Sequence, residues 1–183
     1  MNGVDLDVAN IEPVFAAAQR LDVPLFLHPQ NFGDMTRLQD HHLWNLVGFP
    51  METAMAGARL LMAGVFERFP RLKIVLAHGG GFLPYQLGRL DHGYRVRPEL
   101  RSRLTRPPSA YLGNIYCDSI THNARALRFL IDRFRADHVV LGTDHPFDMG
   151  SDTPVDAVVE LGLPMQQQQA ILGGTLARLL KVG

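Results

Sequence analysis

The chain has 183 residues, of which 18 are Lys or Arg and 18 are Asp or Glu, so its formal net charge is zero. With 46% hydrophobic and 20% charged residues, the composition is typical of a soluble globular protein that can bury a core. The balanced charge, without a block of basic residues, argues against nucleic acids and anionic membranes as partners.

Three further features indicate where such a protein works. No apolar run approaches the roughly 18 residues of a membrane span. Nothing at the N-terminus resembles a signal peptide, and the single cysteine, Cys117, cannot form an internal disulfide. We therefore expect a cytoplasmic enzyme or a small-molecule binding protein.

The predicted elements alternate between helix and strand. Apolar residues at helical spacing predict a helix over residues 10–21, and the run VPLFLHP predicts a short buried strand over residues 23–29. Helix and strand then repeat to the end of the chain. The further predicted helices lie at residues 51–69, 83–95, 123–135 and 165–181, and the further strands at 72–77, 114–118 and 138–142.

This alternation is typical of parallel strands joined by right-handed helical crossovers. Either a doubly wound sheet or a (β/α)8 barrel fits the pattern. In both architectures the carboxyl ends of the strands form one edge, which carries the binding site. The polar residues at the carboxyl ends of the four predicted strands are His28, His78, Asp118 and Asp144. We expect these four side chains to converge on one rim.

In the stretch VVLGTDHPF at residues 139–147, an apolar run ends in Asp144, where an unpartnered buried carboxylate would be costly. Histidine and aspartate are ligands that hold Zn²⁺ or a similar divalent ion, and catalytic sites leave one position open for water. A histidine at a strand end can instead be a hydrogen-bonded structural residue, and an aspartate can be a helix N-cap. The pattern alone leaves the metal site and the structural roles both open.

Five motifs resemble, in order and spacing, the amidohydrolase-related (amidohydrolase 2) family that includes aminocarboxymuconate-semialdehyde decarboxylase and the γ-resorcylate-type decarboxylases. They are LFLHP (residues 25–29), FPMET (49–53), GVFERFPRLKIVLAHGGGFLPYQLGRLD (64–91), RPPSAYLGNIYCDS (106–119) and DHVVLGTDHPF (137–147). The resemblance covers nearly the whole chain. It implies an α/β fold of the (β/α)8 TIM-barrel type with one divalent metal, zinc or manganese.

The resemblance also implies roles for individual residues. His28 of LHP and Asp144 of GTDHPF match metal ligands, and His78 of HGGG matches a catalytic acid/base. Asp144 is implied as a catalytic residue too, and Arg89 of GRLD matches a residue that binds a substrate carboxylate. For Arg89, a solvated helix arginine is the alternative. The implied reaction is non-oxidative decarboxylation, or hydrolysis, of a small carboxylated or cyclic substrate.

The chain departs from the family pattern because the His-x-His or Glu-x-His pair of the first strand is absent. Only the C-terminal half of the barrel is represented, so we expect residues 1–183 to form a single domain with about four parallel strands. Open sheet edges need covering, which a missing N-terminal half or a second copy in a homo-oligomer would supply. Two functions follow: the catalytic half of a metal-dependent carboxy-lyase or hydrolase, or a non-catalytic remnant or partner half-domain.

The remaining histidines receive lesser roles. His145 stands where the family has a tyrosine, and we expect it at the rim rather than on the metal. His41 and His42, with Trp44, lie in a segment that covers the pocket in barrels, with surface placement as the alternative. Ordinary helix or loop positions are expected for His92, His122 and His138. The triple glycine after His78 is expected to permit close backbone approach.

Overall fold

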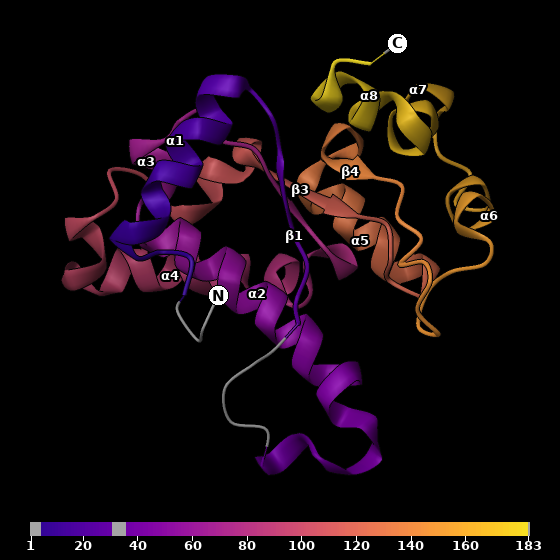
Figure 1. Ribbon diagram of the computed structural model, residues 1–183, viewed down its shortest axis with the longest axis horizontal. Helices are drawn as coiled ribbons and strands as arrows, with labels where there is room; N and C mark the ends of the chain where they lie inside the picture. Colours follow the sequence, from indigo (N-terminus) through magenta and orange to yellow (C-terminus); the bar gives the residue numbers. More distant parts are fainter. Residues whose placement is uncertain (1–4, 31–35, 183) are drawn as a thin grey trace.

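A single parallel sheet organises the computed structural model, which describes residues 5–30 and 36–182 (Figure 1). Its strands are β1 (Leu25–Leu27), β2 (Ile74–Leu76), β3 (Ile115–Asp118) and β4 (Val139–Val140). They lie in the order β1-β2-β3-β4 and all pair in parallel. A doubly wound sheet reverses its strand order at a switch point, whereas a barrel does not. The observed order is therefore that of a barrel segment, as the resemblance implied.

Helices precede and follow the strands. They are α1 (Glu12–Leu21), α2 (Phe49–Met62), α3 (Val65–Arg68), α4 (Leu83–Val96), α5 (Ala124–Phe134), α6 (Pro154–Val159), α7 (Met165–Gln169) and α8 (Thr175–Leu180). The predicted helices at residues 10–21, 83–95 and 123–135 are confirmed within one or two residues, whereas α6 was not predicted. In the described part of the chain, no helix is both long enough and apolar enough to cross a bilayer.

The long helix predicted over residues 51–69 is wrong in one respect, because it is two helices. α2 ends at Met62, and α3 begins at Val65. Between them Gly64 has a φ of 69°, in the left-handed region, and a Cβ at this position would lie 2.3 Å from the carbonyl oxygen of Arg103. The close approach of that distant segment requires glycine, and glycine allows the chain to turn there.

The predicted C-terminal helix over residues 165–181 is also interrupted. A π-helix, Ala170–Gly174, separates α7 from α8, and Gly173 within it has non-helical backbone angles. The carbonyl of Ile171 in this segment accepts a hydrogen bond of 3.0 Å from the N–H of Leu141, directly after β4. The interruption therefore lets this segment cover the β4 edge of the sheet.

The two faces of the sheet differ in what covers them. One face packs against the helices and forms the main core, in which Ile74, Leu76, Ile115, Cys117 and Val139 are joined by Leu60 and Leu61 of α2, Leu83 and Leu87 of α4, and Leu127, Leu130 and Ile131 of α5. The opposite face carries a small cluster of Val75, Tyr116 and Val140, covered by Leu179 of α8.

The prediction of a buried first strand is wrong. Phe26 in the middle of β1 is 58% exposed, and Leu25 and Leu27 are only half-buried. β1 pairs with β2, and no other strand of the described residues pairs with it. It is an edge strand whose outer N–H and C=O groups are open to a further strand.

Cys117 offers a test of how tightly the central strand is held. The residue is fully buried, and burial raises the pKa of its thiol well above 9.0. The folded chain thus retains a proton that the unfolded chain releases, so the folded state loses stability relative to the unfolded state as the pH rises above about 8.5.

At pH 8 we expect a thiol reagent such as dithionitrobenzoate to label Cys117 in the native chain at least about 100-fold more slowly than in the guanidinium-unfolded chain. Equal rates would show that the central strands open readily.

Candidate metal centre

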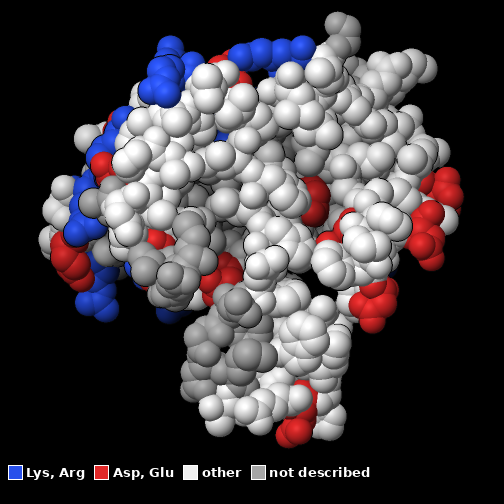
Figure 2. Space-filling model, viewed as in Figure 1, with Lys and Arg blue, Asp and Glu red and all other residues white. Residues whose placement is uncertain are grey.

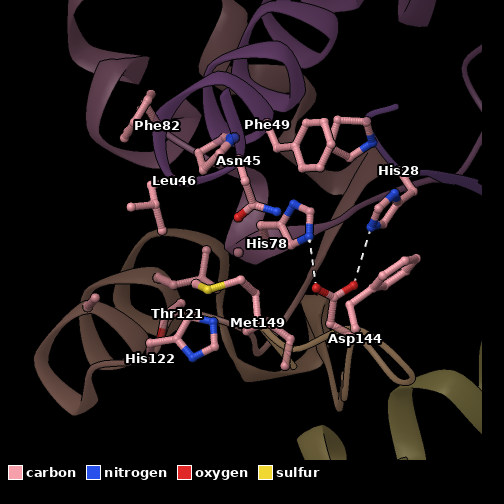
Figure 3. A pocket seen from close by; sticks show the side chains of 18 of the residues that line it. His28, Asn45, Leu46, Phe49, His78, Phe82, Thr121, His122, Asp144 and Met149 are labelled. Atoms are coloured by element: carbon pink, nitrogen blue, oxygen red, sulfur yellow. Dashed lines mark hydrogen bonds and ion pairs between the residues drawn. The ribbon is translucent and has the colours of Figure 1, made fainter. Parts of the chain in front are cut away.

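Three side chains from three strand ends meet at one point of the rim (Figure 3). His28 follows β1, His78 lies in the turn after β2, and Asp144 lies in the loop after β4. His28 Nε2 is 3.3 Å from Asp144 Oδ1, and His78 Nε2 is 3.5 Å from Asp144 Oδ2. All three potential ligand atoms lie within 4.8 Å of one another. The expected convergence of these residues on one rim is confirmed.

The spacing of these atoms fits a divalent cation. Two ligand atoms about 2.1 Å from a tetrahedrally coordinated ion lie roughly 3.4 Å apart. The two nitrogen–oxygen distances, 3.3 Å to Asp144 Oδ1 and 3.5 Å to Asp144 Oδ2, are each near this value. Two imidazoles and one carboxylate also form a donor set that zinc and manganese accept, with room for a water or substrate oxygen. One donor atom from each residue falls within a group up to 4.8 Å across, so His28, His78 and Asp144 could hold a metal once these atoms draw closer together.

The turn that carries His78 has an unusual backbone. His78 has a φ of 54°, and Gly79, Gly80 and Gly81 follow with φ values of 60°, 77° and 59°. A Cβ at Gly79 would lie 2.8 Å from the side chain of Thr121, and a Cβ at Gly81 would lie 2.0 Å from the carbonyl oxygen of Pro50. The triple glycine therefore does permit the close backbone approach expected from the sequence.

Asp118 ends β3 but points to the backbone rather than to the metal centre. Its carboxylate accepts hydrogen bonds from the N–H groups of His78 (2.9 Å), Gly79 (2.8 Å) and Ile120 (3.0 Å). The residue is only 5% exposed, and burial raises its pKa to about 6, although the three donors act in the opposite direction. Asp118 thus lies at the rim, as predicted, but its carboxylate accepts hydrogen bonds from main-chain N–H groups, unlike His28, His78 and Asp144, which face one another.

The environment of His78 favours the neutral imidazole. Burial lowers its pKa, the nearby Asp144 carboxylate raises it, and His28 lowers it again. Its Nδ1 is buried and has no hydrogen-bond partner among the described residues. Figure 3 shows the side chain of Asn45, from the π-helix Trp44–Gly48, pointing toward this ring. A neutral imidazole whose Nε2 faces Asp144 can accept and return a proton near neutral pH.

A cavity of about 990 Å³ opens above the three residues. Its apolar lining includes Trp44, Leu46, Phe49, Phe82, Tyr85, Phe129, Phe147 and Met149. The ring of Phe147 stacks on His28, with 6.1 Å between the ring centroids.

Among the described residues, no Lys or Arg lines the cavity. On the face drawn in Figure 2, basic side chains lie mainly along the left and upper margins, and the middle is largely uncharged. The cavity suits a flat, largely apolar molecule held by polar groups at its floor.

The structure separates the other candidate residues. Arg89 is exposed on α4 and does not line the cavity, so its role in substrate binding stays a prediction. His42 and Trp44 line the cavity, whereas His145 is exposed and outside it. His122 also lines the cavity, which sequence reasoning missed. The available signal was its place in the loop that follows β3, since barrel sites are built from such loops.

Three histidines remain: His41 is exposed and outside the cavity lining, and His92 and His138 have ordinary positions, as expected. His92 is exposed on α4. His138 is buried, stacks on Tyr116 with 4.5 Å between ring centroids, and lies within hydrogen-bonding distance of the carbonyl of Gly113.

Comparisons with known proteins identify the family to which the chain is similar. The family model described as Amidohydrolase matches residues 1–182. The chain is 35% identical to 2-amino-3-carboxymuconate-6-semialdehyde decarboxylase of Dictyostelium discoideum, over 98% of this chain and 51% of that protein. It is also 35% identical to the gamma-resorcylate decarboxylase of Polaromonas sp., over 78% of this chain and 46% of that protein.

Solved structures give the same result. The 5-carboxyvanillate decarboxylase of Sphingomonas paucimobilis superposes with a TM-score of 0.90 at 27% identity, covering 100% of this chain and 56% of that one. A dihydroxybenzoic acid decarboxylase of Polaromonas sp. with bound manganese superposes with a TM-score of 0.85 at 30% identity, covering 97% and 55%. The chain therefore spans about half the length of the relatives it matches and corresponds to the C-terminal half of their barrels.

Proposed function

Because the chain belongs to the amidohydrolase family, we propose that it forms the catalytic half of a metal-dependent carboxy-lyase, an enzyme that removes a carboxyl group without oxidation. The observation that carries this proposal is the convergence of His28, His78 and Asp144 at distances that fit a divalent ion. The relatives support decarboxylation rather than hydrolysis, because those described above are decarboxylases.

His28 and Asp144 are the proposed metal ligands, and the metal is proposed to be zinc or manganese. Manganese is bound in the dihydroxybenzoic acid decarboxylase of Polaromonas sp.. When bound, the ion would polarise an oxygen of the substrate and offset its negative charge. Asp144 would also lie within reach of His78, so that its charge favours the imidazolium when His78 carries a proton.

His78 is the proposed acid/base of the reaction. Its Nε2 faces the centre, and its lowered pKa leaves this atom free to take up a proton near neutral pH. When the carbon–carbon bond to the carboxylate breaks, the electron pair stays on the substrate carbon. His78, after taking up a proton from water, would deliver it to that carbon as carbon dioxide leaves, and the imidazole would return to its neutral form. The surrounding aromatic side chains would limit access of water during this step.

The proposed substrate is a small aromatic or similarly flat carboxylate. The aromatic lining of the cavity supports this class, as do the substrates that the relatives' names give: aminocarboxymuconate semialdehyde, γ-resorcylate and 5-carboxyvanillate. We keep Arg89 as the proposed carboxylate-binding residue, although in this chain it lies outside the cavity.

A non-catalytic half-domain is the second candidate function. The lack of a His-x-His or Glu-x-His pair in the sequence favours it, because His28 and Asp144 alone are fewer ligands than a catalytic zinc site normally has. In both cases the proposed partner is an N-terminal half or a second copy of the chain, and the proposed location is the cytoplasm.

A complementation assay separates the two functions. Carbon dioxide release from 2,6-dihydroxybenzoate, 5-carboxyvanillate and aminocarboxymuconate semialdehyde would be measured with Mn²⁺ or Zn²⁺. The chain would be assayed alone and mixed with the N-terminal half of the Dictyostelium relative. We expect turnover only in the mixture, and a loss of about 10²- to 10⁴-fold with His78→Asn. A metal-loaded mixture without turnover on any substrate would favour the non-catalytic half-domain, and rapid turnover by the chain alone would contradict the half-site proposal.

A further inference from the structure

Asp118 connects the ends of three neighbouring strands. It is the last residue of β3, and both of its carboxylate oxygens are occupied by main-chain donors. Oδ2 accepts from the N–H of His78, while Oδ1 accepts from the N–H groups of Gly79 and Ile120. Asp118 is only 5% exposed, so little of the carboxylate is left for a ligand or a metal.

The hydrogen bonds that Asp118 accepts come from the part of the backbone that determines where the His78 ring points. His78 has a φ of 54°, which non-glycine residues seldom adopt without support from their surroundings. Two successive N–H groups of this turn, those of His78 and Gly79, point to the same carboxylate. From this backbone the imidazole reaches 3.5 Å from Asp144.

The β4 end, which leads to Asp144, also rests on Asp118. A Cβ at Gly142 would lie 2.8 Å from Cβ of Asp118 and 3.2 Å from its Cγ, so the Gly142 backbone packs directly against this side chain. The N–H of Gly142 donates to the hydroxyl of Ser119, the next residue after Asp118. The glycine of the GTDHPF motif is therefore a close-packing position over Asp118.

We propose that Asp118 is a positioning residue that fixes the His78 turn and, through its contact with Gly142, the separation between His78 and Asp144. Its importance for catalysis rests on the proposed function, whereas its control of the turn does not. The carboxylate acts through the main chain, so the residue itself touches neither substrate nor metal. Asp118→Asn should disturb the turn, because an amide nitrogen cannot accept the hydrogen bond that one carboxylate oxygen accepts.

Nuclear magnetic resonance of the complete 183-residue chain tests this proposal. Amide hydrogen exchange would be measured at His78 and Gly79 in the wild type, Asp118→Asn, Asp118→Ala and Gly142→Ala. The matched control is Asp91→Asn, because Asp91 also accepts a main-chain hydrogen bond, from Ser109, but lies outside the cavity lining. We expect exchange at His78 and Gly79 to be roughly 10- to 100-fold faster in the Asp118 variants and unchanged in the control.

A second measurement follows the His78 ring. Added Mn²⁺ should broaden the ring signals of His28 and His78 in the wild type, and in Asp118→Asn the broadening at His78 should weaken while that at His28 persists. Urea unfolding of each variant separates this local change from a general loss of stability.

Unchanged exchange at His78 and Gly79 in Asp118→Asn would overturn the positioning role, even if the variant were less stable. If Asp118→Ala does not fold, Asp118→Asn and Gly142→Ala decide the question, because both should alter the same amides. Failure of the wild-type chain to bind Mn²⁺ would count against the proposed function alone, since the exchange measurement needs no metal.

Discussion

Asp144→Asn and His28→Ala are each expected to lower the affinity of the chain for Mn²⁺ and Zn²⁺ by more than about 100-fold. Replacing a residue that merely hydrogen-bonds to a metal ligand already lowers metal affinity by about 10- to 100-fold, and these substitutions change the ligands themselves. Asn retains the size of Asp144 but removes the negative charge that faces both imidazoles. His28→Ala removes the nitrogen that lies 3.3 Å from that carboxylate. Isothermal titration calorimetry of the purified variants measures both effects.

His78→Asn should leave the affinity within about tenfold of the wild type if His78 is the acid/base rather than a ligand. The exposed His92, replaced by Ala, is the control for unspecific loss of a histidine. A loss as large as that of His28→Ala would reassign His78 as the third ligand, which the 4.8 Å grouping of the donor atoms permits. With only two ligands the chain should bind zinc weakly, so zinc that survives dialysis against a chelator would point to the same reassignment.

The second large effect is expected from Gly81→Ala, which should destabilise the chain by about 3 kcal/mol or more. Gly81 has a φ of 59°, and an added Cβ would lie 2.0 Å from the carbonyl oxygen of Pro50, which is main chain and cannot rotate away. Either the HGGG turn or the start of α2 must move. Metal affinity should fall too, because the same turn carries His78.

Gly88→Ala is the matched control for this substitution. Gly88 lies in α4, and an added Cβ would meet nothing within 4 Å. Here alanine should stabilise the chain by roughly 0.5–1 kcal/mol, because glycine is the poorer helix former. Urea unfolding of both variants gives the comparison. Similar free energies of unfolding for the two would show that the HGGG turn tolerates a side chain and is less constrained than its contacts indicate.

The strands and the metal-site candidates were predictable because each has a local signature. An apolar run followed by a polar residue marks the carboxyl end of a buried parallel strand, and parallel strands in chain order bring those ends together. That reasoning placed His28, His78 and Asp144 correctly on one rim. Assigning a role to each residue required the family resemblance, because the same residue types also serve as caps and structural hydrogen-bonding groups.

What could not be predicted depends on contacts between distant segments. The break at Gly64 follows from the approach of Arg103, which no helical periodicity encodes. The exposure of Phe26 follows from the position of β1 at the sheet edge, not from its own apolar sequence. Asp118 resembled the other rim residues in sequence, and only the direction of its carboxylate distinguishes it from a ligand.

The two edges of the sheet impose different conditions on any partner that completes a closed barrel. At β1 a new strand can simply add, because the outer edge of Phe26 and its neighbours carries no strand among the described residues. At β4 the N–H of Leu141 is already bound to the carbonyl of Ile171, so a strand arriving there must replace an existing hydrogen bond. Closing the barrel thus adds new hydrogen bonds at the β1 edge, whereas at the β4 edge it replaces the hydrogen bond between Leu141 and Ile171. Assembly should begin at β1, and the seam beside β4 should be the last to form and the first to separate.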